Sequence, residues 1–453
     1  MPIDSSGPGG VDRSGGIRIL NPLNSGIQNG YAYVDKDSIG NIIGFSSIEG
    51  NVVPVIPNNI LTKSLCGGVA VTDATTSNYT SNHQMVLAAP FHAVRIGVRN
   101  AHTADITGIK VQVAPSSTFG VAGTAASRTP TSSFTNCTFG GAATGTLVAG
   151  AAANDTITWF DWTEISSVAR SDSGTLPVLH VRVESPTDAT NNRYTNFNIG
   201  DWTGLNTEAN IAGNRGYIAV NQATDGITTP ANFTQTTSTS TPIAIVVQYA
   251  TLIPGKTIMT LGDSLSQGGG STYKCYSDTE RASFSASTVS SPVEVCNFGW
   301  GGQNTATYYL RALSKLTSLA EIKPTHLIYA PFSPNDGATI TATTINAMKS
   351  RLARVIIATK AYGVNLILAN GLPSTPGGTS GVTFGATDPL RISFNNDMLK
   401  YGYIVYDRAS ILNDGLTATG QVTIIKELTT DNLHPNETGW NVLATKLSTI
   451  LGL

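Results

Sequence analysis

The stretch Thr257-Ile258-Met259-Thr260-Leu261-Gly262-Asp263-Ser264-Leu265-Ser266 sets the architecture of the C-terminal half of the chain. Its first half is apolar and β-branched, which favours a buried strand. Its second half leads into a glycine-rich loop, so we expect the hydroxyl of Ser264 at the edge of a sheet. A hydroxyl becomes a useful nucleophile only when a nearby base takes its proton. The segment Asp431-Asn432-Leu433-His434-Pro435, near the chain end, carries a histidine that would serve as that base.

Residues 254–453 have the pattern of an α/β unit. Near-continuous apolar strands with helices between them indicate a parallel sheet covered on both faces. Ligands of such sheets bind beyond the carboxyl ends of the strands, where Ser264 follows the first strand. The predicted strands cover residues 257–261, 293–298, 326–331, 364–370 and 403–406, and the predicted helices cover residues 303–320, 341–361, 388–401 and 436–450.

Two further segments precede this unit. Residues 1–80 are rich in Gly, Asn, Ser and Pro, which predicts an extended arm used for attachment or assembly. Residues 81–253 contain short apolar runs separated by turn-forming residues, and the runs at 93–99 and 109–113 alternate at period two. This spacing favours a β-sandwich of jelly-roll type, which would bind carbohydrate or mediate assembly.

Composition and charge exclude several classes of protein. A length of 453 residues predicts two or three domains. The net charge is −2 and Lys and Arg form no run, so we expect no nucleic-acid partner. No run of about 18 apolar residues exists, so no membrane span is expected. The first residues lack a basic segment followed by an apolar one, so no signal peptide is expected.

The four cysteines, Cys66, Cys137, Cys275 and Cys296, are too few for a disulfide scaffold and show no CxxC spacing, so a zinc site is not expected. Cys275 and Cys296 could meet near the site, but buried free thiols are the favoured interpretation. The five histidines besides His434 are scattered, and we interpret them as structural.

Four short blocks fall at predicted strand ends or helix starts. They are Gly262-Asp263-Ser264, Trp300-Gly301-Gly302, Ser333-Pro334-Asn335-Asp336 and Asp431-Asn432-Leu433-His434. In this order, over about residues 256–453, they resemble the SGNH (GDSL) hydrolase superfamily and its flavodoxin-like fold. The third block of that family usually reads Gly-x-Asn-Asp. Here Ser333 replaces the glycine, while the asparagine and the aspartate remain.

The resemblance implies a mechanism. Ser264 would attack an ester carbonyl, with His434 as general base and then general acid. Asp431 would hold the imidazole and stabilise its cation. The backbone N–H groups of Ser264 and Gly302 and the side-chain amide of Asn335 would form the oxyanion hole. No metal or organic cofactor is required.

Each of these residues also has a purely structural interpretation. Ser264 or Asp431 could cap a helix, His434 could be a structural histidine, and Asn335 could close a turn. Gly302 is hard to separate from its neighbours Gly299 and Gly301, because all three suit a tight loop.

The substrate is less sharply indicated. A β-sandwich joined to an SGNH domain resembles several carbohydrate O-acetylesterases and phage tailspike deacetylases. The loop at 267–272 is polar and small, which does not suggest an acyl-chain channel, and Trp300, Tyr308 and Tyr309 could stack on sugars or simply pack. We expect an acetylated polysaccharide as substrate and a virion-tail or extracellular location, with a homotrimer and virion tail proteins as partners. A lipase or thioesterase, a secreted bacterial esterase and a non-catalytic glycan-binding adhesin are the alternatives.

Overall fold

The structure is a computed structural model that describes a large part of the chain. The described residues are 59–64, 80–100, 103–120, 129–150, 156–185, 245–271, 276–309, 319–336, 340–372, 389–400, 403–412, 427–429, 431 and 433–453, and for some further strands and helix ends the backbone alone. Among these residues, no helix is both long and apolar enough to cross a membrane.

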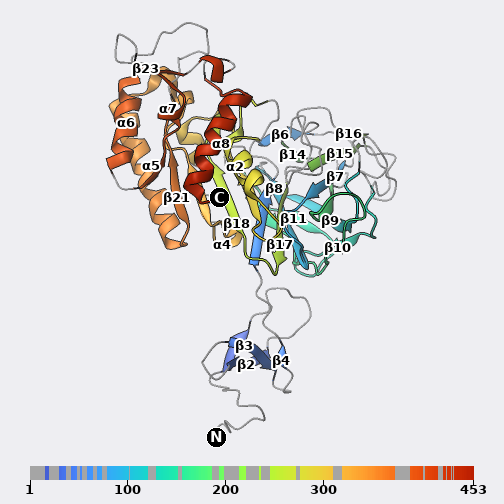
Figure 1. The fold of residues 1–453 in the computed structure, drawn as a ribbon. Coiled ribbons are helices and arrows are strands. Elements are labelled where there is room, and N and C mark those ends of the chain that lie inside the picture. Colours follow the sequence, from blue (N-terminus) through green and yellow to red (C-terminus); the bar gives the residue numbers. More distant parts are fainter. Residues whose placement is uncertain are drawn as a thin grey trace.

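One nine-stranded sheet runs through the main body (Figure 1). Its strands β19, β18, β20, β21 and β22 are parallel, and β12, β8, β17 and β5 each run antiparallel to their neighbours in that order. β5 pairs in parallel with β19 and so joins the two parts. In order across the sheet the strands are β12 (Thr156–Trp159), β8 (Ala93–Asn100), β17 (Ile245–Thr251), β5 (Asn59–Ser64), β19 (Val293–Asn297), β18 (Lys256–Leu261), β20 (His326–Tyr329), β21 (Asn365–Ala369) and β22 (Ile404–Tyr406).

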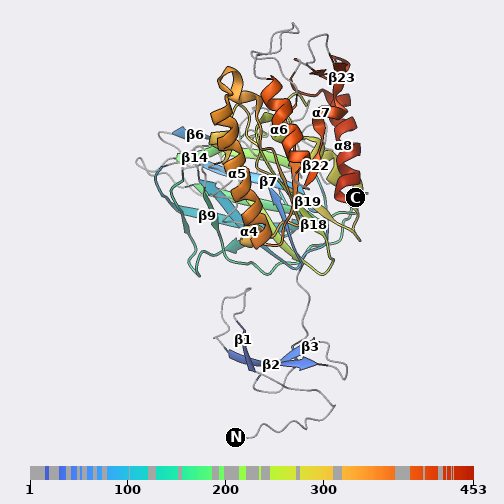
Figure 2. The same cartoon turned by 90° about the vertical axis from the view of Figure 1, so that its left-hand side faces the viewer.

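Helices cover both faces of the parallel part. α5 (Ala342–Ala361) and α6 (Asp388–Lys400) lie on one side, and α2 (Asp278–Ala286) and α8 (Glu437–Leu451) lie on the other (Figures 1 and 2). The pleat of β18 sends neighbouring side chains to opposite faces, so Met259 packs in the cluster under α5 and α6 while Ile258 packs in the cluster under α8. The prediction of an α/β unit with a parallel sheet is confirmed.

The individual elements of this unit follow the sequence pattern closely. Each of the five predicted strands occurs, and α5, α6 and α8 match three of the predicted helices. The predicted helix at 303–320 is helical at its start, over residues 305–309, and α4 (Leu319–Ile322) lies at its end, while residues 310–318 lie outside the described part. The helix α2 was not predicted. Its signal is a capping box, in which Ser277 and Glu280 satisfy each other's backbone N–H groups.

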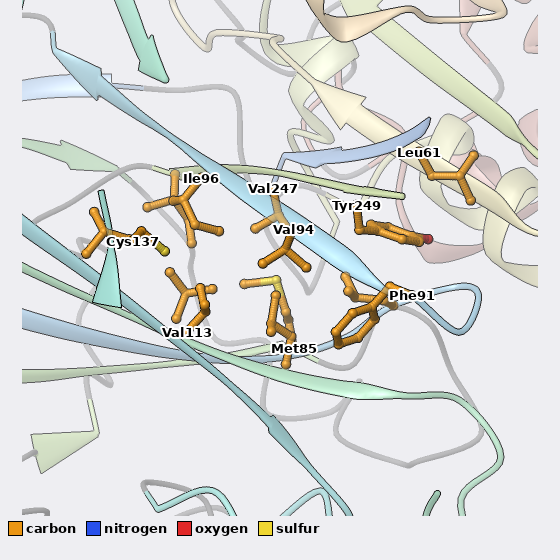
Figure 3. Close-up of a cluster of buried hydrophobic side chains, with 14 of the residues drawn as sticks. Leu61, Met85, Phe91, Val94, Ile96, Val113, Cys137, Val247 and Tyr249 are labelled. Carbon is orange, nitrogen blue, oxygen red and sulfur yellow. The ribbon is translucent and has the colours of Figure 1, made fainter. Parts of the chain in front are cut away.

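A second sheet faces the antiparallel part across a shared core. It contains β10 (Thr135–Cys137), β9 (Ile106–Ser116), β13 (Val178–Ser185), β7 (Tyr79–Val86), β15 (Asn214–Val220) and β16 (Thr234–Gln235), and β11 (Gly145–Leu147) pairs with β9. Figure 3 shows Met85 and Val113 of this sheet beside Val94 and Val247 of the other. The jelly-roll topology stays a prediction, because much of residues 186–244 lies outside the described part.

The N-terminal segment contributes to more than one sheet. β1 (Gly16–Ile19), β2 (Gly30–Lys36), β3 (Ile42–Ser47) and β4 (Val52–Val53) form a four-stranded antiparallel sheet that both views draw apart from the main body. β5, which also lies within the segment predicted as an arm, instead occupies the middle of the nine-stranded sheet. β6 (Val69–Asp73) pairs with β14 (Arg193–Phe197).

A buried ionic network lies where the two parts of the large sheet meet. Lys63 of β5 donates from Nζ to the carbonyl of Val86 at 2.8 Å and lies 3.7 Å from Oε2 of Glu294. The other oxygen of Glu294 accepts the backbone N–H of Ala88 and the hydroxyl of Tyr249, both at 2.8 Å. Burial raises the pKa of Glu294, against the opposing charge of Lys63. The network therefore connects β5, β17 and β19 with the loop after β7.

Candidate active site

The structure brings the three residues of the predicted triad together. Oγ of Ser264 lies 2.9 Å from Nε2 of His434, and Nδ1 of the same ring lies 2.7 Å from Oδ2 of Asp431. Both ring nitrogens thus have a partner within hydrogen-bond distance. A carboxylate at Nδ1 fixes the proton there, so that Nε2 faces the hydroxyl as an acceptor. The arrangement can take a proton from Ser264.

The position of Ser264 follows from the end of β18. Asp263 accepts the backbone N–H of Leu265 at 2.9 Å and so acts as N-cap of the short helix α1 (Ser264–Gln267). Ser264 is the first residue of that helix, half-buried, with its backbone N–H in the unpaired first turn. A side chain at position 262 would crowd this turn, because its Cβ would lie 2.2 Å from Oγ of Ser266 and 3.0 Å from Cβ of Ala330.

Asp431 organises the loop that carries the histidine as well as the ring itself. Its Oδ1 accepts the backbone N–H groups of His434 at 2.7 Å and of Leu433 at 3.1 Å. Burial raises the pKa of Asp431, but the hydrogen bonds from the backbone and ring of His434 lower it more, so the pKa lies below its usual value. A lowered pKa keeps the Asp431 carboxylate ionised, so that it can stabilise the imidazolium form of His434. Asn436 then caps α8 by accepting the N–H of Gly439.

The glycine loop after β19 offers one uncommitted amide among its three glycines. The N–H of Gly299 donates to the side chain of Asn297, and the N–H of Gly301 donates to Oε1 of Gln267 at 2.7 Å. Among the described residues, no acceptor receives a hydrogen bond from the N–H of Gly302. Gly302 is exposed and has a φ of 76°, which favours glycine. Of the three glycines, Gly302 is therefore the one whose N–H remains for a ligand.

Asn335 is held at the same edge by its own contacts. It lies in the 3₁₀ helix η4 (Pro334–Thr339) after β20 and is exposed. One hydrogen of its Nδ2 reaches the carbonyl of Gln303 at 3.0 Å. An amide has a second N–H hydrogen, which remains for a ligand. The turn interpretation and the oxyanion interpretation of Asn335 are thus compatible.

Ser333, where the resembled family usually has glycine, contributes contacts that were not predicted. Its Oγ lies 2.5 Å from Oδ2 of Asp263 and accepts the backbone N–H of Asn335 at 3.1 Å. Burial raises the pKa of Asp263, and the hydrogen bond from Ser333 opposes that rise. The sequence showed the substitution itself, but nothing in it indicated the partner.

Gly269 fixes how closely the loop after α1 approaches the histidine. A Cβ on Gly269 would lie 2.7 Å from Cδ2 of His434, a distance that side chains do not tolerate. The loop is tied down further along, where Ser271 donates to Glu437 of α8 at 3.0 Å. Arg281 of α2 binds the same glutamate at 2.6 Å. This loop therefore packs directly on the imidazole.

The other residues that were singled out differ in their exposure. Tyr308 and Tyr309 are buried, and the hydroxyl of Tyr308 donates to the carbonyl of Ala330 at 2.6 Å, so these two rings do not form a sugar-stacking surface. Trp300 is half-buried. Cys137 and Cys296 are free and buried, while Cys66 and Cys275 lie outside the described residues. Among the described residues, no group of three or more His, Cys, Asp or Glu could hold a metal ion.

Comparisons with known proteins give matches among solved structures only. No family model and no curated protein matches this chain. A structure described as a lipolytic protein of the G-D-S-L family from Desulfitobacterium hafniense is 18% identical, with 43% of this chain and 99% of that one covered and a TM-score of 0.34. A GDSL-like lipase from Bacteroides thetaiotaomicron is 14% identical, with 44% and 88% covered and a TM-score of 0.33.

A third match is the psychrotrophic esterase EstA from Pseudoalteromonas. It is 18% identical, with 44% of this chain and 97% of that one covered and a TM-score of 0.31. Each of the three likenesses covers less than half of this chain.

Proposed function

We propose that this protein is a serine hydrolase of carboxylic esters. The observation that carries the proposal is the continuous series of contacts from Ser264 Oγ through both nitrogens of His434 to Asp431, at 2.9 and 2.7 Å. In the first half-reaction, Oγ bonds to the acyl carbon while its proton passes to Nε2 of the histidine. The same proton then leaves with the alcohol, and the acyl group stays on the serine.

In the second half-reaction, water attacks the acyl carbon and His434 takes its proton. The bond to Oγ breaks, the carboxylic acid departs and Ser264 regains its proton. In both halves, negative charge develops on the carbonyl oxygen. The backbone N–H groups of Ser264 and Gly302 and the amide of Asn335 would donate to it, and one such donor typically lowers the barrier by about 3 kcal/mol.

As substrate we propose a short acyl group, acetate above all, on a polysaccharide. In the described loops after β18 and β19, residues 262–271 and 298–304, the exposed residues are Gly270, Gly302 and Asn304, which are small or polar, and Trp300 is half-buried. None of the exposed large apolar side chains in the described part belongs to the loops that carry the triad. A long acyl chain would have little apolar surface to contact here, whereas a hydroxyl-rich carrier would find hydrogen-bond partners.

Acetate release tests this proposal. The intact chain is mixed with acetylated capsule, lipopolysaccharide or xylan, and with nitrophenyl esters from acetyl to palmitoyl. We expect acetate from at least one glycan, a preference for short esters, and a loss of about four orders of magnitude or more in kcat for Ser264→Ala. Faster cleavage of long-chain esters would favour a lipase. Equal turnover by wild type and Ser264→Ala would contradict the proposal that the protein is a serine hydrolase. Glycan binding without turnover would favour an adhesin.

The setting of the enzyme is a separate proposal. A homotrimer in a virion tail, joined to other tail proteins through residues 1–80, would place the esterase against surface polysaccharide. Light scattering would test the trimer, and the genomic neighbourhood would separate a phage gene from that of a secreted bacterial esterase.

A further inference from the structure

One buried hydroxyl links the loops that surround the nucleophile. Ser333 follows β20 and is fully buried. The backbone N–H of Asn335 can only donate, so at 3.1 Å the hydroxyl oxygen accepts from it. The hydroxyl proton then has two acceptors nearby, Oδ2 of Asp263 at 2.5 Å and the carbonyl of Gln303 at 3.2 Å. The carboxylate is both nearer and charged, so it receives the proton.

The carboxylate of Asp263 is enclosed directly beside the nucleophile. It is 1% exposed, and its other oxygen caps α1 through the N–H of Leu265. An enclosed carboxylate is costly without hydrogen-bond donors. Among the described residues, Ser333 is the one side chain that donates a hydrogen bond to it. A glycine at position 333 would leave Oδ2 without that donor.

The charged groups around Asp263 include His434 of the triad. Burial raises its pKa, and the hydrogen bond from Ser333 is the strongest of the interactions that lower it, ahead of the charges of Arg408 and His434. Asp336 and Tyr308 also face it from the loop after β20 and from the segment after the glycine loop. A carboxylate kept ionised here favours the imidazolium that forms during each half-reaction.

We propose that Ser333 is a positioning residue, whose hydroxyl holds the Asp263 carboxylate on one side and the Asn335 backbone on the other. In this way it sets the oxyanion amide relative to Ser264 and keeps a negative charge beside the triad. Glycine has no side chain to make either contact. In this chain, the hydrogen bond from Ser333 to Asp263 therefore connects the Gly262-Asp263-Ser264 block with the block at 333–336. The inference rests on the proposed esterase activity.

The first test is Ser333→Ala, assayed on nitrophenyl acetate with the intact chain. We expect kcat to fall about tenfold with KM almost unchanged, since a hydrogen bond to a charged group is lost and substrate contacts are kept. Ser283→Ala is the matched control. Ser283 of α2 is also fully buried, but its Oγ has no hydrogen-bond partner among the described residues, so its removal should leave kcat within about twofold.

The second test combines this change with Asp263→Asn, which keeps an oxygen for the N–H of Leu265 but carries no charge. We expect Ser333→Ala to lower kcat less than about twofold in that background, because residues that act through each other are not additive. Ser333→Ala alone also removes a bond that favours the carboxylate. The pKa of Asp263 therefore rises, and the acid limb of kcat moves to higher pH, a shift that Asp263→Asn abolishes.

The outcomes separate the two proposals. Additive losses with an unshifted acid limb would show that Ser333 serves folding alone and would overturn the inference. So would a Ser333→Ala enzyme as active as Ser283→Ala. If instead wild type cleaves no ester, or cleaves it as Ser264→Ala does, the proposed function fails and the inference falls with it. Thermal melting of each variant separates loss of alignment from loss of fold.

Discussion

At the scale of single residues, the site depends on which backbone N–H groups already donate a hydrogen bond within the protein and which remain for a ligand. The backbone amides of Gly299 and Gly301 donate to the side chains of Asn297 and Gln267, whereas the amide of Gly302 has no acceptor among the described residues. Sequence alone could not separate these three glycines, because each suits a tight turn equally well. The distinction came from Gln267, whose side chain binds Gly301 and could not be placed from its sequence position.

Asn335 gives the sharpest prediction at this scale. Asn335→Ala should lower kcat about 100-fold or more with KM almost unchanged, because the donor acts on charge present only in the transition state. The matched control is Gln303→Ala. Gln303 holds Asn335 through its backbone carbonyl, which the substitution keeps, so kcat should stay within about twofold. Steady-state kinetics on nitrophenyl acetate would check both, and a raised KM with unchanged kcat would place Asn335 in ground-state binding instead.

At the scale of elements, helix α2 shows what periodicity misses. Every strand of the parallel sheet was predictable, because a strand buried on both faces is a short apolar run. The helix α2 is mostly polar yet buried, so no apolar stripe indicates it. Its start at Ser277 is marked by the capping box alone. β5 was missed for a related reason, since its partners lie far away in the chain and pairing of that kind leaves no local pattern.

The capping box predicts a pH dependence of stability. Glu280 is fully buried and accepts from the hydroxyl of Ser277 and, at 2.6 Å, from Nδ2 of Asn297. Burial raises its pKa from 4.5 to about 7 against these hydrogen bonds. The folded protein therefore binds the proton more tightly than the unfolded chain. The stability that this provides is present below pH 4.5 and is lost as the pH rises to about 7, a change of up to about 3 kcal/mol.

Melting temperatures at pH 5 and pH 8 would check this. We expect the fall in Tm between the two to be smaller in Glu280→Gln than in wild type, because glutamine does not titrate. Glu164→Gln, at an exposed position, is the control and should keep the wild-type difference. If Tm falls as far between pH 5 and pH 8 in Glu280→Gln as in wild type, other groups cause the pH dependence of stability.

At the scale of the whole molecule, the two halves are joined more closely than the change of pattern near residue 254 suggests. The sequence separates a β-rich segment from an α/β segment, and each has its own core. The sheet nevertheless continues from β17 through β5 into β19. Edge strands expose unpaired backbone groups, and β5 covers that edge of the parallel sheet. β5 therefore lies near the start of the chain but in the middle of the large sheet.

The buried network at this junction predicts that the halves depend on one another. Lys63→Met leaves the charge of Glu294 without its partner, so we expect a loss of about 3–5 kcal/mol in the free energy of unfolding. Lys349→Met is the control. Lys349 pairs with Asp397 at 2.6 Å near the surface, where the same change should cost less than about 1 kcal/mol. Urea unfolding would measure both.

A double variant shows whether the unpaired charge is the cause. Lys63→Met with Glu294→Gln removes both charges but keeps a side-chain oxygen for the N–H of Ala88 and the hydroxyl of Tyr249. Replacing a buried pair by neutral groups is often close to neutral, so much of the lost stability should return. Calorimetry of Lys63→Met should also show the two halves unfolding together, because β5 pairs with strands of both. Two separate transitions in wild type would instead show that the continuous sheet does not couple the two cores.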